Sequence, residues 1–385
     1  MKGIAVLGSS GSIGQSTLEV IRSFPRHFKV IALSANSNVT VLYRQIKEFH
    51  PLFACVNDLK AADELKGLVR PGSTKILVGK EGLEHLLTDR TIDEVVLAIS
   101  GSSALLPLLK AIDSGKNIAL ANKEALVMAG SIIMKKAKKK KIKIIPIDSE
   151  QSAIWQCLDG QDRSKLKTIY LTASGGPFRA KPRSKLKNIS ISRALRHPRW
   201  KMGRKISVDS ATLMNKGLEL LEAMYLFGAG PEKIKIVIHP EAIIHSMVEF
   251  IDGSLLAQLS VTDMRIPIQY ALSYPQRLPT KLESIDLYKL GSLNFEKPDF
   301  KNFTCLKLAY RVAYTLGTTP AVFNASNEVA VEEFLKGKLA FLSIPVVIRK
   351  VLDRHSNILS PNIEDILEAD AWSRREAYQI IEGLA

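Results

Sequence analysis

Short apolar runs alternate with amphipathic stretches over the first 148 residues of the chain. Each run is too short for a helix and lacks polar alternation, which is typical of a strand buried on both faces of a parallel sheet. Strands that alternate with helices in this way predict an α/β fold for residues 1–148, an N-terminal Rossmann-like domain with a doubly wound parallel sheet. The runs are Ile4–Leu7, Val30–Leu33, Phe53–Val56, Ile76–Val78, Val95–Ile99, Ile118–Ala121 and Ile142–Ile147.

The pattern changes after residue 148, where strand-like runs become fewer and irregular segments longer. The strand-like runs are Ile169–Thr172, Ile234–Ile238, Ile244–Phe250 and Ser254–Val261. The last two flank Asp252-Gly253, a turn signal that predicts an antiparallel hairpin. We expect an α+β central catalytic domain over 149–280, with a sheet that can pair between two subunits.

The last part of the chain has helical periodicity. Pro279 and Pro298 punctuate an irregular segment, so residues 281–300 are expected to form a linker. A C-terminal helical domain is expected over 301–385, with helices at 304–316, 320–336, 343–354 and 362–382.

A glycine-rich turn, Gly8-Ser-Ser-Gly11-Ser-Ile-Gly14, follows the first strand and opens a helix. Such a turn lets the backbone approach a pyrophosphate, whose charge the helix N-terminus binds. The alternative is a tight turn without a ligand. The second strand ends in Ser34-Ala-Asn-Ser-Asn38, which has no carboxylate to bind a ribose hydroxyl or repel a 2′-phosphate. A dinucleotide site that prefers NADPH to NADH is therefore expected.

Two carboxylates, Asp148 and Glu150, follow the seventh strand, at the sheet edge where α/β proteins bind ligands. Residues two apart on an extended backbone project to one side, so both can face one point. Paired carboxylates repel unless a cation intervenes, and oxygen ligands favour Mg²⁺ or Mn²⁺. The alternative is a helix N-cap for Gln151–Leu158.

The segment Ser207–Glu219 contains the residue types that hold a phosphate dianion, namely Ser210, Asn215 and Lys216. Glu219 lies one helical turn beyond Lys216 and would add a third carboxylate to the metal site. A surface Lys–Glu pair is the plainer interpretation. His239 and His245 are interpreted as structural histidines.

The chain is basic, but its excess charge is local. Of 54 Lys and Arg residues against 38 Asp and Glu, eighteen lie in 135–143 and 179–205, which contain no acid. The rest of the chain is balanced, with 36 basic and 38 acidic residues. The first segment is interpreted as a solvated helix end. The second contains Arg196-His-Pro-Arg-Trp-Lys-Met-Gly203, either a mobile lid over an anionic substrate or a nucleic-acid contact.

Composition excludes several classes of protein. With 46% hydrophobic and 24% charged residues, disorder and collagen-like fibre are excluded. Three separated cysteines indicate neither a disulfide framework nor a thiolate zinc site, and a reducing cytoplasm is expected. Apolar stretches are too short for a membrane helix, and the N-terminus has no signal-peptide character, so no membrane partner is expected.

Taken in order, the motifs resemble those of the 1-deoxy-D-xylulose 5-phosphate reductoisomerase family over essentially the whole chain. They are Gly8–Gly14, Ala121-Asn-Lys-Glu124, Asp148-Ser-Glu150, Ala173-Ser-Gly-Gly-Pro-Phe178, His197–Gly203, Lys205–Glu219, His239-Pro240, Ile244–Glu249, Asp263-Met-Arg265 and Asn324-Ala-Ser-Asn-Glu-Val-Ala330. The resemblance implies an NADPH- and metal-dependent enzyme of non-mevalonate isoprenoid (isopentenyl diphosphate) biosynthesis. It would rearrange 1-deoxy-D-xylulose 5-phosphate and reduce the resulting aldehyde to 2-C-methyl-D-erythritol 4-phosphate. A homodimer is also implied.

By motif match, the resemblance implies the following site residues. NADPH would contact Ser10, Gly11, Ser12, Ile13, Asn36, Ser37, Asn38, Asn122, Glu124 and Gly203. A Mg²⁺ or Mn²⁺ ion would be held by Asp148, Glu150 and Glu219. The phosphorylated sugar would contact Lys123, Ser149, Glu150, Ser174, His197, Trp200, Ser210, Asn215, Lys216 and Glu219, with Trp200 on a flap near 196–204. The catalytic set would comprise Lys123, Asp148, Glu150, His197 and Glu219.

A few positions depart from the family pattern. Ser10 stands where Thr is usual, and Asn36-Ser37 replace Gly and a variable residue before Asn38. Glu241-Ala242 replace Gln-Ser, and Thr262 replaces Pro. None removes a proposed metal or phosphate ligand, and Asn36-Ser37 lie where the resemblance implies contacts to the 2′-phosphate.

Two other functions stay open at this point. The basic segments allow a nucleic-acid-binding protein, whose affinity would fall steeply with salt. The nucleotide fold also allows an NADP-dependent dehydrogenase without skeletal rearrangement, which would reduce the aldehyde but leave deoxyxylulose phosphate untouched.

Overall fold

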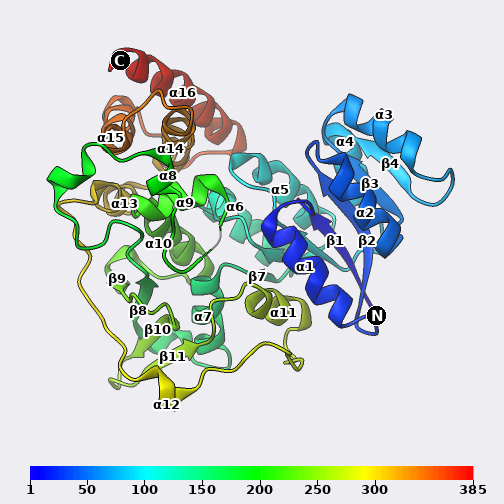
Figure 1. The fold of residues 1–385 in the computed structure, drawn as a ribbon, viewed down its shortest axis with the longest axis horizontal. Helices are drawn as coiled ribbons and strands as arrows, with labels where there is room; N and C mark the ends of the chain where they lie inside the picture. Colours follow the sequence, from blue (N-terminus) through cyan, green and yellow to red (C-terminus); the bar gives the residue numbers. More distant parts are fainter. Residues whose placement is uncertain (201, 385) are drawn as a thin grey trace. The chain divides into compact units, whose positions relative to one another are not determined.

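A computed structural model describes residues 1–200 and 202–384 (Figure 1). The chain divides into two compact units. Unit 1 comprises Met1–Ala125, Ile133–Ser152 and Asp263–Lys281, and unit 2 comprises Leu126–Ile132, Ala153–Thr262 and Leu282–Ala385. The domain boundaries expected at 148, 280 and 300 stay a prediction.

A seven-stranded parallel sheet forms the centre of unit 1, in the order β4-β3-β2-β1-β5-β6-β7. Each strand contains or overlaps one of the predicted apolar runs, so the doubly wound sheet is confirmed. Strand order reverses between β1 and β5, and the crevice beyond their carboxyl ends is where such sheets bind ligands. The strands are β1 (Lys2–Leu7), β2 (Phe28–Ala35), β3 (Phe53–Val56), β4 (Lys75–Val78), β5 (Glu94–Leu97), β6 (Asn117–Leu120) and β7 (Ile144–Pro146).

Helices connect these strands and cover the sheet. α1 packs against α11, and α4 packs against α5. α11 also contacts β6 and β7, so a segment that follows the hairpin in the sequence returns to the first sheet. The helices are α1 (Ser12–Ser23), α2 (Val39–Phe49), α3 (Leu59–Leu68), α4 (Gly79–Leu87), α5 (Leu105–Asp113), α6 (Lys123–Lys140), α7 (Ser149–Leu158) and α11 (Arg265–Ser273); α6 and α7 continue into unit 2.

Unit 2 contains a four-stranded sheet in the order β11-β10-β8-β9. Its strands are β8 (Leu166–Ala173), β9 (Ile234–Ile238), β10 (Ile244–Phe250) and β11 (Leu255–Leu259). β10 and β11 form the predicted antiparallel hairpin, and β8 pairs in parallel with β9. α10 contacts β8 and β9, and α13 packs against α10.

The last four helices of unit 2, α13 to α16, are the four expected near the C-terminus, and each lies within two residues of its predicted ends. All the helices below lie in unit 2. They are α8 (Ile191–Ala194), α9 (Arg204–Ala211), α10 (Met214–Phe227), α12 (Leu287–Leu290), α13 (Thr304–Thr315), α14 (Thr319–Leu335), α15 (Ile344–Arg354) and α16 (Ile363–Glu382). The segment around α12 is mostly exposed, as expected of a linker, and Glu296 forms one bridge to Ile238.

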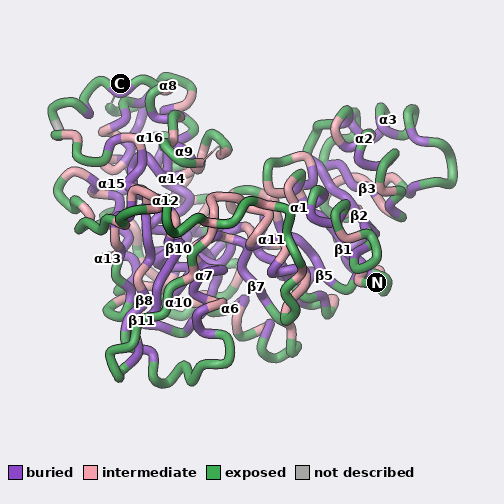
Figure 2. The backbone as a smooth tube through the Cα atoms, turned by 60° about the horizontal axis from the view of Figure 1, so that its bottom comes forward, coloured by how far each residue is buried: buried purple, intermediate pink, exposed green. Residues whose placement is uncertain are grey.

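Burial follows the layers of each unit. The central strands β1 and β5 are buried along nearly their whole length, whereas β11 at the edge of its sheet is mostly exposed (Figure 2). None of the described helices has both the length and the apolar character to cross a bilayer.

Candidate active site

The glycine turn after β1 has no space for side chains at two of its positions. Gly8 has a φ of +86°, a conformation that favours glycine. A Cβ atom on Gly14 would lie 2.3 Å from the carbonyl oxygen of Gly8. The turn therefore stays close to the N-terminus of α1, where backbone N–H groups attract an anion. Four predicted cofactor residues, Ser10, Gly11, Ser12 and Ile13, line this turn at partly or fully exposed positions.

The residues after β2 form the second part of the predicted cofactor site. Asn36, Ser37 and Asn38 are exposed, and none carries a negative charge. The Oδ1 atom of Asn38 accepts a hydrogen bond from the backbone N–H of Val41 at 3.1 Å and so caps α2. This bond orients the Asn38 amide, whose NH₂ group remains a donor for an anionic ligand.

Asn122 connects the carboxyl ends of two strands. Its Nδ2 atom donates to the carbonyl oxygens of Ile99 and Gly101 beyond β5, at 2.9 and 3.0 Å. Its Oδ1 atom accepts from the N–H of Ala125 and caps α6, which follows β6. The same Nδ2 atom lies 3.0 Å from a Glu124 carboxylate oxygen. This predicted cofactor residue thus also organises the loops beside it.

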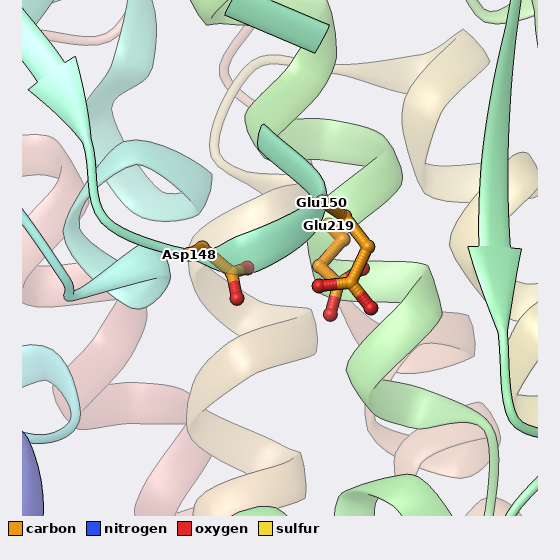
Figure 3. Close-up of side chains that lie close together, drawn as sticks. All are labelled: Asp148, Glu150 and Glu219. Carbon is orange, nitrogen blue, oxygen red and sulfur yellow. The ribbon is translucent and has the colours of Figure 1, made fainter. Parts of the chain in front are cut away.

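Three carboxylates come together at the end of β7. One oxygen from each of Asp148, Glu150 and Glu219 lies within 4.8 Å of the other two (Figure 3). The sequence predicted that Asp148 and Glu150 face one point because they lie two apart on an extended backbone, and this reason is only partly right. Glu150 is in the first turn of α7, which begins at Ser149, rather than on an extended strand. Asp148 precedes the helix, so the turn of backbone at the helix start brings the two carboxylates to one place.

Positively charged and amide groups surround these carboxylates. The Nζ atom of Lys123 lies 2.8 Å from Asp148 Oδ2, and both side chains are largely buried. Asn215 donates to one Glu219 oxygen at 2.5 Å, and Lys216 forms an ion pair with the other. Clustered carboxylates repel, and these partners offset part of that repulsion. The Ser149 hydroxyl donates to Glu150.

His197 is held in a defined orientation. Its Nδ1 atom accepts hydrogen bonds from the backbone N–H groups of Arg199 and Trp200, at 3.2 and 2.9 Å. Nδ1 is therefore unprotonated, and in the neutral ring the proton resides on Nε2. Nε2 lies 3.0 Å from the Ser174 hydroxyl, to which it donates. The Trp200 ring lies near that of His245, with centroids 6.2 Å apart.

The loop that carries Ser174 packs directly on α9. A Cβ on Gly176 would lie 2.6 Å from the Ser210 carbonyl oxygen, so only glycine permits this approach. Gly203 caps α9 and accepts from the backbone N–H and the hydroxyl of Ser207. Ser210 is buried in α9. Lys201, part of the flap motif, lies outside the described residues.

Thr212 also shapes the site, although it was not among the predicted site residues. Its hydroxyl contacts the carbonyl oxygens of Val208 and Asp209 in α9 and accepts from the N–H of Met214 in α10. Threonine at a helix junction is a local signal for such a bond. His239 is a structural histidine, as interpreted: it is fully buried and bonds to backbone groups of Asn294, Ile243 and Ile244.

The parallel sheet, its glycine turn and the carboxylate cluster together define a class, a dinucleotide-dependent oxidoreductase with a Rossmann-like fold.

Comparison with known proteins narrows this class to one family. A family model described as 1-deoxy-D-xylulose 5-phosphate reductoisomerase matches residues 4–130, and two models of its C-terminal domain match 144–227 and 259–376. The reductoisomerase of Caldanaerobacter subterraneus is 50% identical over 97% of this chain and 98% of its own length. That of Pelotomaculum thermopropionicum is 48% identical over the full length of both. The chain belongs to the 1-deoxy-D-xylulose 5-phosphate reductoisomerase family.

Solved structures agree in detail with this assignment. A crystal structure of a DOX-P reductoisomerase with NADPH, fosmidomycin and magnesium has a TM-score of 0.95 and 42% identity, covering 100% of this chain and 99% of that one. The Zymomonas mobilis enzyme with NADPH has a TM-score of 0.92 and 40% identity, covering 99% of both chains.

Proposed function

We propose that the chain converts 1-deoxy-D-xylulose 5-phosphate to 2-C-methyl-D-erythritol 4-phosphate with NADPH and Mg²⁺ or Mn²⁺, in isoprenoid biosynthesis. The observation that carries the proposal is the carboxylate cluster beside β7 in a chain of this family. The reaction breaks and re-forms a carbon–carbon bond, then transfers a hydride from NADPH to the aldehyde with uptake of one proton.

The turn after β1 supports NADPH as the cofactor. Its closely packed glycines keep the turn against the start of α1, and the first backbone N–H groups of a helix suit a pyrophosphate. Hydroxyl and amide groups, with no carboxylate among them, occupy Asn36, Ser37 and Asn38. Two of the related structures contain NADPH. We assign Ser10, Gly11, Ser12, Ile13, Asn36, Ser37, Asn38, Asn122, Glu124 and Gly203 to this site.

The three carboxylates fit a divalent cation. One oxygen from each carboxylate lies within 4.8 Å of the other two, so the three side chains could converge on one ion. Carboxylate oxygens are also the ligands that Mg²⁺ and Mn²⁺ prefer. When bound, such an ion polarises the substrate ketone and stabilises negative charge on its oxygens. We assign Asp148, Glu150 and Glu219 as its ligands.

The remaining residues position the substrate. Lys123 would place its ammonium group near the reacting carbon atoms, because it forms an ion pair with the proposed metal ligand Asp148. Ser174, Ser210, Asn215 and Lys216 supply hydroxyl, amide and ammonium donors to the phosphate. His197 would present its Nε2–H group to the same anion in place of the Ser174 hydroxyl, since its Nδ1 atom is occupied by backbone donors. Ser149 orients Glu150 through its hydroxyl.

The segment 196–204 would act as a flap over the substrate. Trp200 presents a large ring at its centre, with basic residues on either side. A closed basic flap would exclude water from the aldehyde and from the charges around it.

A homodimer and a cytoplasmic location complete the proposal. β11 lies at the edge of its sheet and exposes Leu255, Leu256 and Leu259, at 51%, 39% and 38% of their surface. An apolar edge strand needs a cover, which a second copy of the chain supplies. All three cysteines are buried and free, which suits a reducing compartment. We propose no nucleic-acid or membrane partner.

The test follows NADPH oxidation by the purified protein with 1-deoxy-D-xylulose 5-phosphate, and identifies the product by carbon NMR. We expect oxidation that requires Mg²⁺, stops with chelator and yields a branched product. A linear product would indicate reduction of the ketone without rearrangement and contradict the proposal. Absence of oxidation, with NADPH binding intact, would contradict the assigned substrate.

A further inference from the structure

Helix α14 buries three polar side chains, Asn324, Ser326 and Asn327, with no exposed surface. Burial of polar groups is costly unless they form hydrogen bonds. Ser326 donates to the Phe323 carbonyl oxygen and Asn324 to Glu328, both within α14. Asn327 instead reaches another helix. Its Nδ2 atom donates to Asp209 Oδ1 on α9 at 2.9 Å, across 118 positions of sequence.

Asp209 is an unusual partner because its carboxylate is buried, in the last turn of α9. Its side chain is 1% exposed, and its second oxygen lies 3.0 Å from the Nζ atom of Lys205, one turn earlier. A buried carboxylate is stable only with charged or hydrogen-bonding partners. The Asn327 bond is therefore a charge-assisted hydrogen bond in a place shielded from water, where such bonds are strong.

The bond satisfies the buried Asp209 carboxylate but leaves part of the Asn327 amide without a partner among the described residues. The Oδ1 atom of Asn327 is buried and has no hydrogen-bond partner among the described residues. An unpaired buried acceptor destabilises the folded state, and an apolar side chain at this position would avoid that cost. Asparagine at position 327 contributes an N–H donor to the Asp209 carboxylate on α9, which an apolar side chain could not.

Movement of α9 would reach the proposed phosphate site by two contacts. The Ser210 carbonyl oxygen follows Asp209 and packs against Gly176, two residues from Ser174. Thr212 contacts the Asp209 carbonyl oxygen and accepts from Met214, the first residue of the helix that carries Asn215 and Lys216. α9 thus holds both groups of phosphate-binding candidates in register.

We infer that Asn327 is a positioning residue: its amide holds the Asp209 carboxylate, and through it places α9 and the phosphate-binding residues. This gives the C-terminal helices a role in substrate binding. The inference rests on the proposed function, because the phosphate belongs to the proposed substrate.

The test compares Asn327→Leu with Asn324→Leu. The control residue is on the same helix and equally buried, but its bond stays within α14. We expect Asn327→Leu to raise KM for 1-deoxy-D-xylulose 5-phosphate by about tenfold, because α9 and the phosphate-binding residues would lose their position. The Kd for NADPH should not change. Asn324→Leu should lower the melting temperature comparably without changing KM.

A reciprocal exchange separates positioning from packing. Asp209→Asn and Asn327→Asp should each raise KM, and the double variant should restore a carboxylate–amide pair and return KM toward the wild-type value. An unchanged KM in Asn327→Leu, or a double variant no better than either single one, would overturn the inference. A wild-type protein that does not consume the substrate would instead refute the proposed function.

Discussion

Gly14 determines how closely the turn after β1 can approach a dinucleotide. Because a Cβ there would lie 2.3 Å from Gly8 O and 2.5 Å from Ser9 Cα, Gly14→Ala must displace the turn. We predict at least about tenfold weaker NADPH binding, measured by fluorescence titration, since a displaced turn misplaces several N–H donors.

Gly67 provides the matched control for this substitution. It lies inside α3, and a Cβ there would meet no atom within 4 Å. Gly67→Ala should raise the free energy of unfolding by about 0.5–1 kcal/mol and leave NADPH binding unchanged. Equal NADPH affinity in both variants would contradict the proposed role of the turn.

Residue types predicted much of the candidate site, because carboxylates, glycines and phosphate-binding donors have recognisable chemistry. Asp148 and Glu150 were predicted to face one point, although the helix start brings them together rather than an extended strand. The bond between Asp209 and Asn327 could not be predicted. Nothing local in either segment shows that α9 and α14 pack against each other.

At the scale of elements, the hydrophobic pattern predicted the strands and C-terminal helices well. Buried strands such as β3 (Phe53–Val56) and β9 (Ile234–Ile238) have the predicted ends, since apolar runs of that length have few other structures. The pattern did not show that α11 would pack on β6 and β7. Such returns depend on the surfaces left uncovered by other elements.

The junction of α9 and α10 links the C-terminal helices to the proposed phosphate-binding residues. Leu213 has a φ of +57°, a left-handed conformation between the two helices, and Thr212 bridges them. Gly217, in α10, allows α13 to approach, since a Cβ there would lie 2.6 Å from that of Ala309. The two helices with phosphate-binding candidates therefore rest on the C-terminal helices.

For the whole molecule, the exposed leucines of β11 are the basis of the proposed dimer. We predict that Leu256→Lys shifts the protein from dimer to monomer in sedimentation velocity, because a charge would be buried in an apolar interface. Leu359→Lys is the control, since Leu359 is 76% exposed and lies far along the chain from the hairpin. A Leu256→Lys protein that remains dimeric would place the interface elsewhere.

We propose that Asp148, Glu150 and Glu219 bind one divalent cation. Titration of the metal-free protein with Mn²⁺ tests this directly, with electron paramagnetic resonance to measure the free and bound ion. Wild type and the control Glu232→Gln, at an exposed site, should bind one ion per chain with equal affinity. Glu219→Gln should bind Mn²⁺ at least about 100-fold more weakly, because a neutral amide replaces a carboxylate ligand. Its NADPH affinity should be unchanged. If Glu219→Gln bound Mn²⁺ as tightly as wild type, the three carboxylates would not be the metal site.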